Sequence, residues 1–296
     1  MKITNKRNLP QTIVNVLRRP TYNKGAAHIS ATELINSPRI VQLKRMHWNE
    51  LEQDAAEMVW SLFGSAVHNI LEHGKDEHHI VEQRLTSHLD GWTISGAIDL
   101  QEVEEDGIII NDYKVTSSWT VMTEKQDWVN QLNIYAWLVE AVKKQVVKKL
   151  QIIAIIRDWK ERETKNPDYP QAPIVTIEIP LWPMEDRIAF IKARLDEHSE
   201  ALLDASLESP MRPCTSDQMW ERPTLYAVMK EGGKRAKKVY EVREDADRDL
   251  AAQPAGHFIE VRPGSRVRCE GYCPVSGFCD QYQQWRAENA HDSIDQ

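Results

Sequence analysis

Apolar residues recur along the chain in two different periods, which predict alternating helices and strands. Residues 49–73, 125–144 and 183–205 carry them at the 3.6-residue spacing of a helix, and Ser30 with Glu33 forms a capping-box pattern that opens a further helix. Strands are predicted where residues alternate or form short apolar runs, at 80–89, 92–104, 107–116, 150–159 and 174–182. This order predicts an α/β fold in which helices cover a mixed sheet.

The pattern changes after Ser209. Three prolines at 210, 213 and 223 precede two alternating segments, 224–230 and 237–242, which flank a glycine-containing tip and predict a hairpin. Three of the four cysteines follow it. We therefore expect two domains, a core at residues 1–208 and a C-terminal extension at residues 209–296 with a basic hairpin and a cysteine cluster.

Composition and charge narrow the class of protein. The chain is 41% hydrophobic and 28% charged, and no apolar run approaches the roughly 20 residues needed to span a bilayer. The basic N-terminus lacks the continuous apolar stretch of a signal peptide, so we expect a cytoplasmic protein without a membrane partner. A net charge of −8 argues against non-specific coating of nucleic acid, but one basic cluster could hold a DNA backbone: Lys234, Arg235, Lys237 and Lys238.

The apolar run 108–110 leads directly into Asp112 and Lys114, an acid and a base two residues apart. Strand alternation puts both on one face, and pairing with segment 92–104 would bring Asp99 beside them. Two carboxylates suit Mg²⁺ or Mn²⁺, and a neighbouring lysine can stabilise charge on a phosphate. The alternative is a solvated strand end. Trp119, one of ten tryptophans, could stack on a base, although a core or structural role is what we expect.

Four short motifs in order, "GSAVHNILE", "SGAID", "NDYKVTS" and "QLNIYAWL", give the chain a family resemblance. Residues 29–150 resemble the RecB-like nucleases of the PD-(D/E)XK superfamily, which include the iron–sulfur nucleases of CRISPR adaptation and the AddB-type exonucleases. The resemblance implies a restriction-endonuclease-like core, in which helices flank a mixed central sheet. It also implies hydrolysis of DNA with a divalent metal.

The resemblance implies roles for individual residues. The metal ligands would be His68, Asp99, Asp112 and the backbone carbonyl of Val115, and Lys114 would be the catalytic lysine. Gln131 and Tyr135 would contact DNA or brace the site, and Glu82 falls where the family has an acidic strand residue. Without the family, His68 would be a partly buried helical histidine, and Gln131 and Tyr135 would be ordinary helix-surface residues.

The cysteines form the second candidate site. Cys269, Cys273 and Cys279 lie within eleven residues, and Cys214 is the only other cysteine. Four thiolates suit an iron–sulfur cluster or zinc, while incidental core thiols are the third alternative. The resemblance favours a [4Fe–4S] cluster, although Cys214 follows the nuclease motifs and Ser37 stands where the family has an upstream cysteine.

These patterns predict a metal-dependent DNA nuclease, and an exonuclease acting on ends or single strands is our first choice. Its expected setting is recombination, repair, phage or CRISPR-related DNA processing, together with protein partners. A structure-specific or restriction-type endonuclease is one alternative, and a non-catalytic DNA-binding or assembly subunit is another. The chain has no G-x-x-x-x-G-K sequence, which argues against an accompanying ATP-driven motor.

Overall fold

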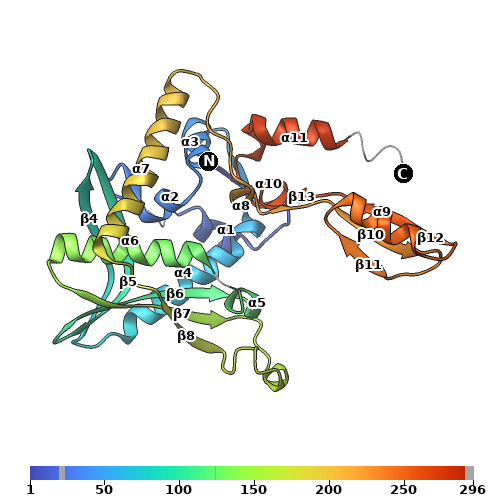
Figure 1. Cartoon of the computed structure of the whole chain (residues 1–296). Helices are drawn as coiled ribbons and strands as arrows, with labels where there is room; N and C mark the ends of the chain where they lie inside the picture. The colour runs from blue at the N-terminus through green and yellow to red at the C-terminus, as the bar shows by residue number, and fades with distance from the viewer. Residues whose placement is uncertain (20–23, 124, 291–296) are drawn as a thin grey trace. The chain divides into compact units, whose positions relative to one another are not determined.

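The structure is a computed structural model of the whole chain, and it describes residues 1–19, 24–123 and 125–290. Figure 1 shows the arrangement of its elements. The strands are β1 (Lys2–Thr4), β2 (Ile29–Ser30), β3 (Glu52–Asp54), β4 (His79–Leu89), β5 (Trp92–Glu104), β6 (Gly107–Thr116), β7 (Val147–Ile156), β8 (Ile174–Ile179), β9 (Glu221–Arg222), β10 (Leu225–Lys230), β11 (Lys238–Tyr240), β12 (His257–Arg262) and β13 (Ser265–Arg266).

The α-helices are α1 (Gln11–Leu17), α2 (Ala31–Ile35), α3 (Pro38–Met46), α4 (Val59–Leu71), α5 (Ser118–Val121), α6 (Gln126–Lys143), α7 (Met184–Ser206), α8 (Ser216–Met219), α9 (Arg243–Ala251), α10 (Val267–Gly271) and α11 (Asp280–Ala290). The described residues also form the 3₁₀ turns η1 (Ala55–Met58), η2 (Glu72–Gly74), η3 (Glu161–Lys165) and η4 (Ser276–Phe278). The chain is a mixed α/β fold, as the sequence predicts.

A mixed six-stranded sheet forms the centre of the fold. β5 pairs antiparallel with β4 along its length, parallel with β2 near its start and antiparallel with β6 near its end. β7 lies parallel to β6, and β8 closes the sheet antiparallel to β7. Because the connection from β6 to the parallel β7 must cross over the sheet, it contains the long helix α6.

Helices cover both faces of this sheet (Figure 1). Neighbouring strand residues point to opposite faces. On β6, the Tyr113 ring lies against His68 of α4, whereas the Lys114 amine reaches Gln131 of α6. Helices α4 and α6 therefore lie on opposite faces. The core fills the space beneath α6 with fully buried side chains such as Ile98.

Gly96 allows α6 to pack closely against β5. A Cβ atom at this position would lie 2.7 Å from Leu138 Cδ1 and 2.8 Å from Tyr135 Cε1. Any larger residue would displace α6 or its side chains. The glycine in "SGAID" is thus required for helix packing near the predicted site.

The sequence correctly predicted most elements of the sheet, but the helix expected from Asn49 begins ten residues later. Residues Glu52–Asp54 instead form β3, parallel to β1. The buried Asp54 carboxylate accepts hydrogen bonds from the backbone of Lys6 and Ala56 and from the hydroxyl of Thr4. These tertiary bonds override the local helical period. The capping box of Ser30 and Glu33 is confirmed at the start of α2.

The chain divides into two compact units: residues 1–42 with 48–211, and residues 43–47 with 212–296. In the second unit, β10 pairs antiparallel with β11, as the predicted hairpin requires, and also with β12. The end of α3 belongs to this unit, where the His47 ring stacks on Phe278 with centroids 4.1 Å apart. The domain boundary at 208/209 remains a prediction. No helix in the described ranges is long and apolar enough to span a membrane.

Candidate active site and cysteine cluster

The candidate active site lies where two neighbouring strands separate. β5 and β6 pair as far as Leu100 and Asn111, so the next opposing residues would be Asp99 and Asp112. Beyond that point β6 continues beside β7 alone. At this point the backbone N–H of Tyr113 donates to a side chain of β5, the carboxylate oxygen Oδ2 of Asp99, at 2.9 Å. This bond fixes the buried Asp99 carboxylate in the opening between the strands.

Glu82 reaches the same place from β4 through an unusual backbone conformation. The β4–β5 register would pair it with Asp99, but that position is missing from the ladder. Its φ is +48°, in the left-handed region that non-glycine residues rarely occupy. Such strain persists only where the surroundings impose it, and it occurs often at functional sites. The two carboxylates and the His68 ring contribute three potential metal ligands within 4.8 Å of one another.

His68 approaches the carboxylates from α4. Its Nε2 lies 3.0 Å from the carbonyl oxygen of Tyr113, which can only accept, so this nitrogen carries the proton in that contact. Its Nδ1 faces Asp99 Oδ1 at 3.5 Å and Glu82 Oε1 at 3.6 Å. A bare lone pair between two carboxylates is unfavourable. The Nδ1 atom is therefore placed to bind a cation together with the carboxylates, and a ring fixed in this way is typical of a histidine metal ligand.

A polar chain links β6 to α6 on the other side of the opening. Lys114 Nζ lies 2.5 Å from Asp112 Oδ2 and also donates to Gln131 Oε1 at 3.2 Å. Gln131 in turn donates to the buried Tyr135 hydroxyl at 2.8 Å. Gln131 and Tyr135 therefore lie on one face of α6. There Gln131 holds the Lys114 amine, and Tyr135 holds Gln131. The buried Asp112 Oδ2 is thus paired with the Lys114 ammonium group.

The electrostatics of the site favour binding of a cation. Burial raises the pKa of Asp99 to about 7, and the nearby charge of Asp112 adds to this rise. His68, the Tyr113 N–H and Lys114 act in the opposite direction but do not cancel it. A carboxyl whose charged form is this unfavourable is one that a divalent ion would stabilise.

The structure brings together most of the predicted site residues, but in two adjoining groups. The tight group is His68, Glu82 and Asp99, whereas Asp112 pairs with Lys114 beside it. Val115 follows on β6, where it pairs with Ile155 of β7, and its role as a backbone ligand stays a prediction. Glu82 was not among the metal ligands expected from the sequence, because its left-handed backbone has no signal in the residue pattern. Trp119 is 64% exposed, so of its expected roles the core position is excluded.

The second unit brings the four cysteines together. Cys214 and Cys279 are buried, and Cys269 and Cys273 are partly buried. The pKa of the Cys269 thiol is raised to about 11, first by burial and then by the three other thiols, while Arg266 acts in the opposite direction. Burial also raises the pKa of Cys273. These groups would stay protonated unless a metal compensated their charge.

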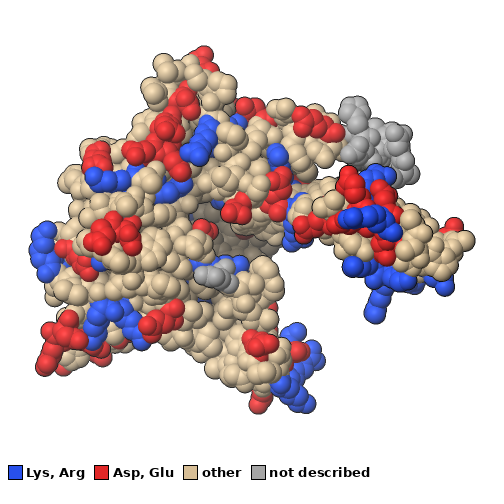
Figure 2. Space-filling model, in the orientation of Figure 1, with Lys and Arg blue, Asp and Glu red and all other residues tan. Residues whose placement is uncertain are grey.

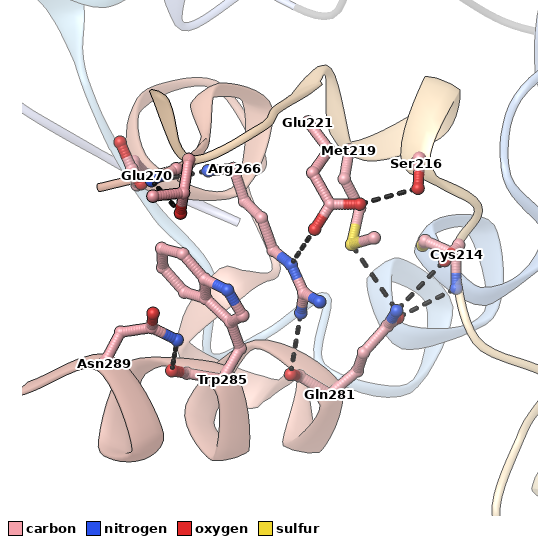
Figure 3. A network of polar contacts seen from close by, with 11 residues as sticks. Cys214, Ser216, Met219, Glu221, Arg266, Glu270, Gln281, Trp285 and Asn289 are labelled. Atoms are coloured by element: carbon pink, nitrogen blue, oxygen red, sulfur yellow. Dashed lines mark hydrogen bonds and ion pairs between the residues drawn. The ribbon is translucent and has the colours of Figure 1, made fainter. Parts of the chain in front are cut away.

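A polar network fixes the surroundings of Cys214 (Figure 3). The Gln281 side chain bonds both backbone groups of Cys214, accepting from its N–H at 2.8 Å and donating to its carbonyl at 3.0 Å. Arg266 donates to the Gln281 carbonyl and to Glu221, which also accepts from Ser216. The segment before α8 is thereby tied to α11, which follows Cys279.

The four predicted basic residues lie at and after the β10–β11 tip, and all of them are exposed. Lysine and arginine side chains gather on the side of this small sheet where β11 lies (Figure 2). Lys237 also bonds to Gln253, and Lys238 lies over the Tyr240 ring at 4.9 Å. The cluster is therefore a solvated cationic edge, partly held by neighbouring side chains.

Comparisons with known proteins follow the same direction. Residues 39–280 match the family model of the PD-(D/E)XK nuclease superfamily. Among solved structures, the chain is similar to the crystal structure of SSO0001, with 19% identity and a TM-score of 0.43 over 63% of this chain and 82% of that one. It is also similar to LHK-Exo, an alkaline exonuclease from Laribacter hongkongensis, with 14% identity and a TM-score of 0.33 over 60% of this chain and 91% of that one. The structure of LHK-Exo in complex with dAMP has 14% identity to this chain and a TM-score of 0.35, over 61% of this chain and 89% of that one. No curated protein sequence matches the chain.

Proposed function

Because the chain belongs to the PD-(D/E)XK nuclease superfamily, we propose that it is a divalent-metal-dependent deoxyribonuclease. The observation that carries the proposal is the group of His68, Glu82 and Asp99 beside the pair of Asp112 and Lys114. The RecB-like order of its motifs supports an exonuclease that acts on DNA ends. Its place in a DNA-processing complex with protein partners is part of the same proposal.

The residues present fit a divalent cation. His68 Nδ1 and the carboxylates of Glu82 and Asp99 offer one nitrogen and several hard oxygens, a donor set that suits Mn²⁺ and Mg²⁺. Asp112 lies close enough to Asp99 for its charge to raise the pKa of Asp99, which supports its recruitment as a further ligand. A metal held there would make a water molecule more acidic and offset negative charge on the scissile phosphate. The imidazole ligand should make Mn²⁺ at least as effective as Mg²⁺.

Lys114 supplies the positive charge that the reaction needs on the protein side. Its amine is held by Asp112 and by Gln131, whose own amide is fixed by the buried Tyr135. A positioned ammonium group can orient an attacking water molecule and stabilise the charge that develops on phosphate oxygens. Gln131 and Tyr135 act here as positioning residues, because they hold Lys114.

We also propose that the four cysteines hold a [4Fe–4S] cluster with a structural role. The four thiols lie close enough together that Cys214, Cys273 and Cys279 each raise the pKa of Cys269. Four thiolates suit either zinc or an iron–sulfur cluster, and the resemblance to the RecB-like nucleases favours the cluster. Stoichiometric zinc in a colourless, anaerobically prepared sample would favour the alternative.

A further part of the proposal is that Lys234, Arg235, Lys237 and Lys238 bind the DNA backbone. Each phosphate contact adds about 0.9 on duplex DNA, or about 0.7 on single strands, to the log–log salt slope of binding. Replacing all four residues by alanine should weaken binding to every sequence and flatten this slope. An unchanged slope would leave the tip as a solvated hairpin.

The function is tested by incubating the full chain with end-labelled linear DNA and with covalently closed circular DNA. We expect mononucleotides or short products from linear DNA with Mn²⁺ and none after chelation. Release of fragments from circular DNA would identify an endonuclease instead. Lys114→Ala should abolish cleavage, while Lys149→Ala serves as control, since Lys149 lies on the adjacent β7 and pairs with Glu178 at the surface. Intact DNA of both kinds under every metal condition would contradict the proposal.

A further inference from the structure

Two large aromatic side chains stand exposed beside the candidate active site. Trp60, in the first turn of α4, is 59% exposed, and Trp119, on α5, is 64% exposed. Phe63, one turn after Trp60, is 53% exposed, and its ring centroid lies 5.8 Å from that of Trp60. Exposed apolar groups of this size cost hydration free energy, and when they cluster they mark a binding surface.

The two tryptophans are anchored to the same pair of residues. Arg157 lies over the Trp60 ring, with its guanidinium carbon 4.4 Å from the centroid. The next residue, Asp158, accepts hydrogen bonds from the backbone N–H of Ser118 at 2.7 Å and from its hydroxyl at 3.3 Å. These bonds hold the start of α5, which carries Trp119. The segment Arg157–Asp158 thus contacts the Trp60 ring through Arg157 and the start of the Trp119 helix through Asp158.

This segment adjoins the strand that carries the catalytic candidates. The backbone N–H of Arg157 donates to the carbonyl of Thr116, the last residue of β6, at 3.0 Å. Lys114 lies two residues earlier on the same strand. On the other side, Trp60 is eight residues before His68 on α4, which is about 12 Å along the helix axis. Trp60 thus lies on the helix that carries His68, and Trp119 lies on the short helix that follows the strand of Lys114.

Each tryptophan also has a cation of its own. Arg157 covers Trp60, and Lys125 Nζ lies 4.6 Å from the centroid of the Trp119 ring. Ring and cation together match a nucleotide, whose flat base stacks on an aromatic face and whose phosphate pairs with a positive charge.

We propose that Trp60 and Trp119 are stacking surfaces for unpaired nucleobases of a single DNA strand that enters the active site. The inference rests on the proposed nuclease function for the identity of its ligand, DNA, and adds how the strand is held. Arg157 and Lys125 would contact the phosphates that flank the stacked bases. Because every base has a π-face, this contact would be largely independent of sequence.

The test measures binding apart from cleavage. Full-length protein is titrated, with Ca²⁺ in place of Mn²⁺, into fluorescently labelled (dT)₁₅ and into an abasic strand of equal length, and intact substrate is verified on a gel. We expect the abasic strand to bind at least tenfold more weakly. Trp60→Ala and Trp119→Ala should each weaken (dT)₁₅ binding by about 5- to 100-fold. Their salt slope should stay unchanged, because phosphate contacts remain.

Two further variants distinguish stacking from apolar contact. Trp60→Phe keeps a π-face and should retain most of the affinity, whereas Trp60→Leu keeps only apolar area and should bind like Trp60→Ala. Ile70→Ala is the matched control, because Ile70 is a 69% exposed apolar side chain on the same helix that has no aromatic face. It should bind as wild type does.

Three results would overturn the proposal: equal affinity for the abasic strand, unchanged affinity in both alanine variants, or equal affinity of the Phe and Leu variants. The last would indicate an apolar protein-docking surface instead. Failure of the nuclease function is a separate outcome. Base-dependent binding without cleavage under any metal condition would leave the stacking surfaces standing and refute catalysis, whereas cleavage with unaffected tryptophan variants would refute the stacking surfaces alone.

Discussion

Replacing Asp99 by asparagine should stabilise the metal-free protein while it abolishes metal binding. Asp99 is buried, and its pKa is raised to about 7 from 3.8, first by burial and then by Asp112. A folded-state pKa above the unfolded value means that the folded state binds the proton more tightly. The unfolding free energy therefore falls as pH rises from about 4 to 7, and the penalty is complete above pH 7.

The magnitude follows from the shift. About three pKa units at about 1.4 kcal/mol each give a penalty of about 4 kcal/mol at pH 8, and a smaller penalty of about 2 kcal/mol at pH 5. Asparagine carries no charge, and its side-chain oxygen can still accept from the Tyr113 N–H. Part of the gain will be lost because the new amide must find its own partners. We expect Asp99→Asn to gain about 1–3 kcal/mol at pH 8 and clearly less at pH 5.

The assay is urea unfolding in chelator at both pH values, followed by addition of Mn²⁺. Mn²⁺ should stabilise the wild type, because it binds only the folded state, and should leave Asp99→Asn unchanged. Asp106→Asn is the control, since Asp106 is an exposed residue of the turn between β5 and β6. A variant less stable than wild type at pH 8 without metal, or one stabilised equally by Mn²⁺, would refute the reasoning.

Three further predictions address the same structure. Mn²⁺ affinity, measured by calorimetry, should rise as pH increases through about 7, since Asp99 must lose its proton before it binds the ion; a flat profile between pH 6 and 8 would contradict this. Gly96→Ala should lose about 1–3 kcal/mol of stability and reduce cleavage while Mn²⁺ affinity persists, because the new methyl group displaces Leu138 and Tyr135; wild-type melting and cleavage would show that α6 can yield at no cost. Cys269→Ser should bleach the brown colour of anaerobically purified protein and expose the C-terminal unit to protease, and a colourless wild type would count against the cluster.

The sequence was sufficient to predict most strands of the sheet and to predict that Asp112 and Lys114 lie on the same face of it. The apolar run 108–110 marks a buried strand, and the two-residue period of a strand places Asp112 and Lys114 together, as the 2.5 Å contact confirms. The joining turn between residues 104 and 107 places Asp99 opposite Asp112 by register alone. Local rules therefore predicted this part of the site, since it depends on strand geometry.

Other features depend on contacts that no local pattern records. Glu82 reaches the metal group through a left-handed backbone, which the ladder of β4 and β5 imposes on a residue with no preference for it. The exposure of Trp119 depends on where α5 docks, and a tryptophan in the sequence suggests burial. The strand at Glu52–Asp54 exists because the N-terminal segment pairs with it.

The central claim is that one set of side chains holds a catalytic metal while Lys114 acts on the phosphate. The most direct measurement follows Mn²⁺ binding and cleavage of end-labelled DNA in parallel for Glu82→Gln and Lys114→Ala. We expect Glu82→Gln to lose both Mn²⁺ binding and DNA cleavage. Lys114→Ala should bind Mn²⁺ with an affinity within about threefold of wild type but should not cleave DNA. Cleavage at the wild-type rate by both variants, or by wild type after complete removal of divalent metal, would contradict it.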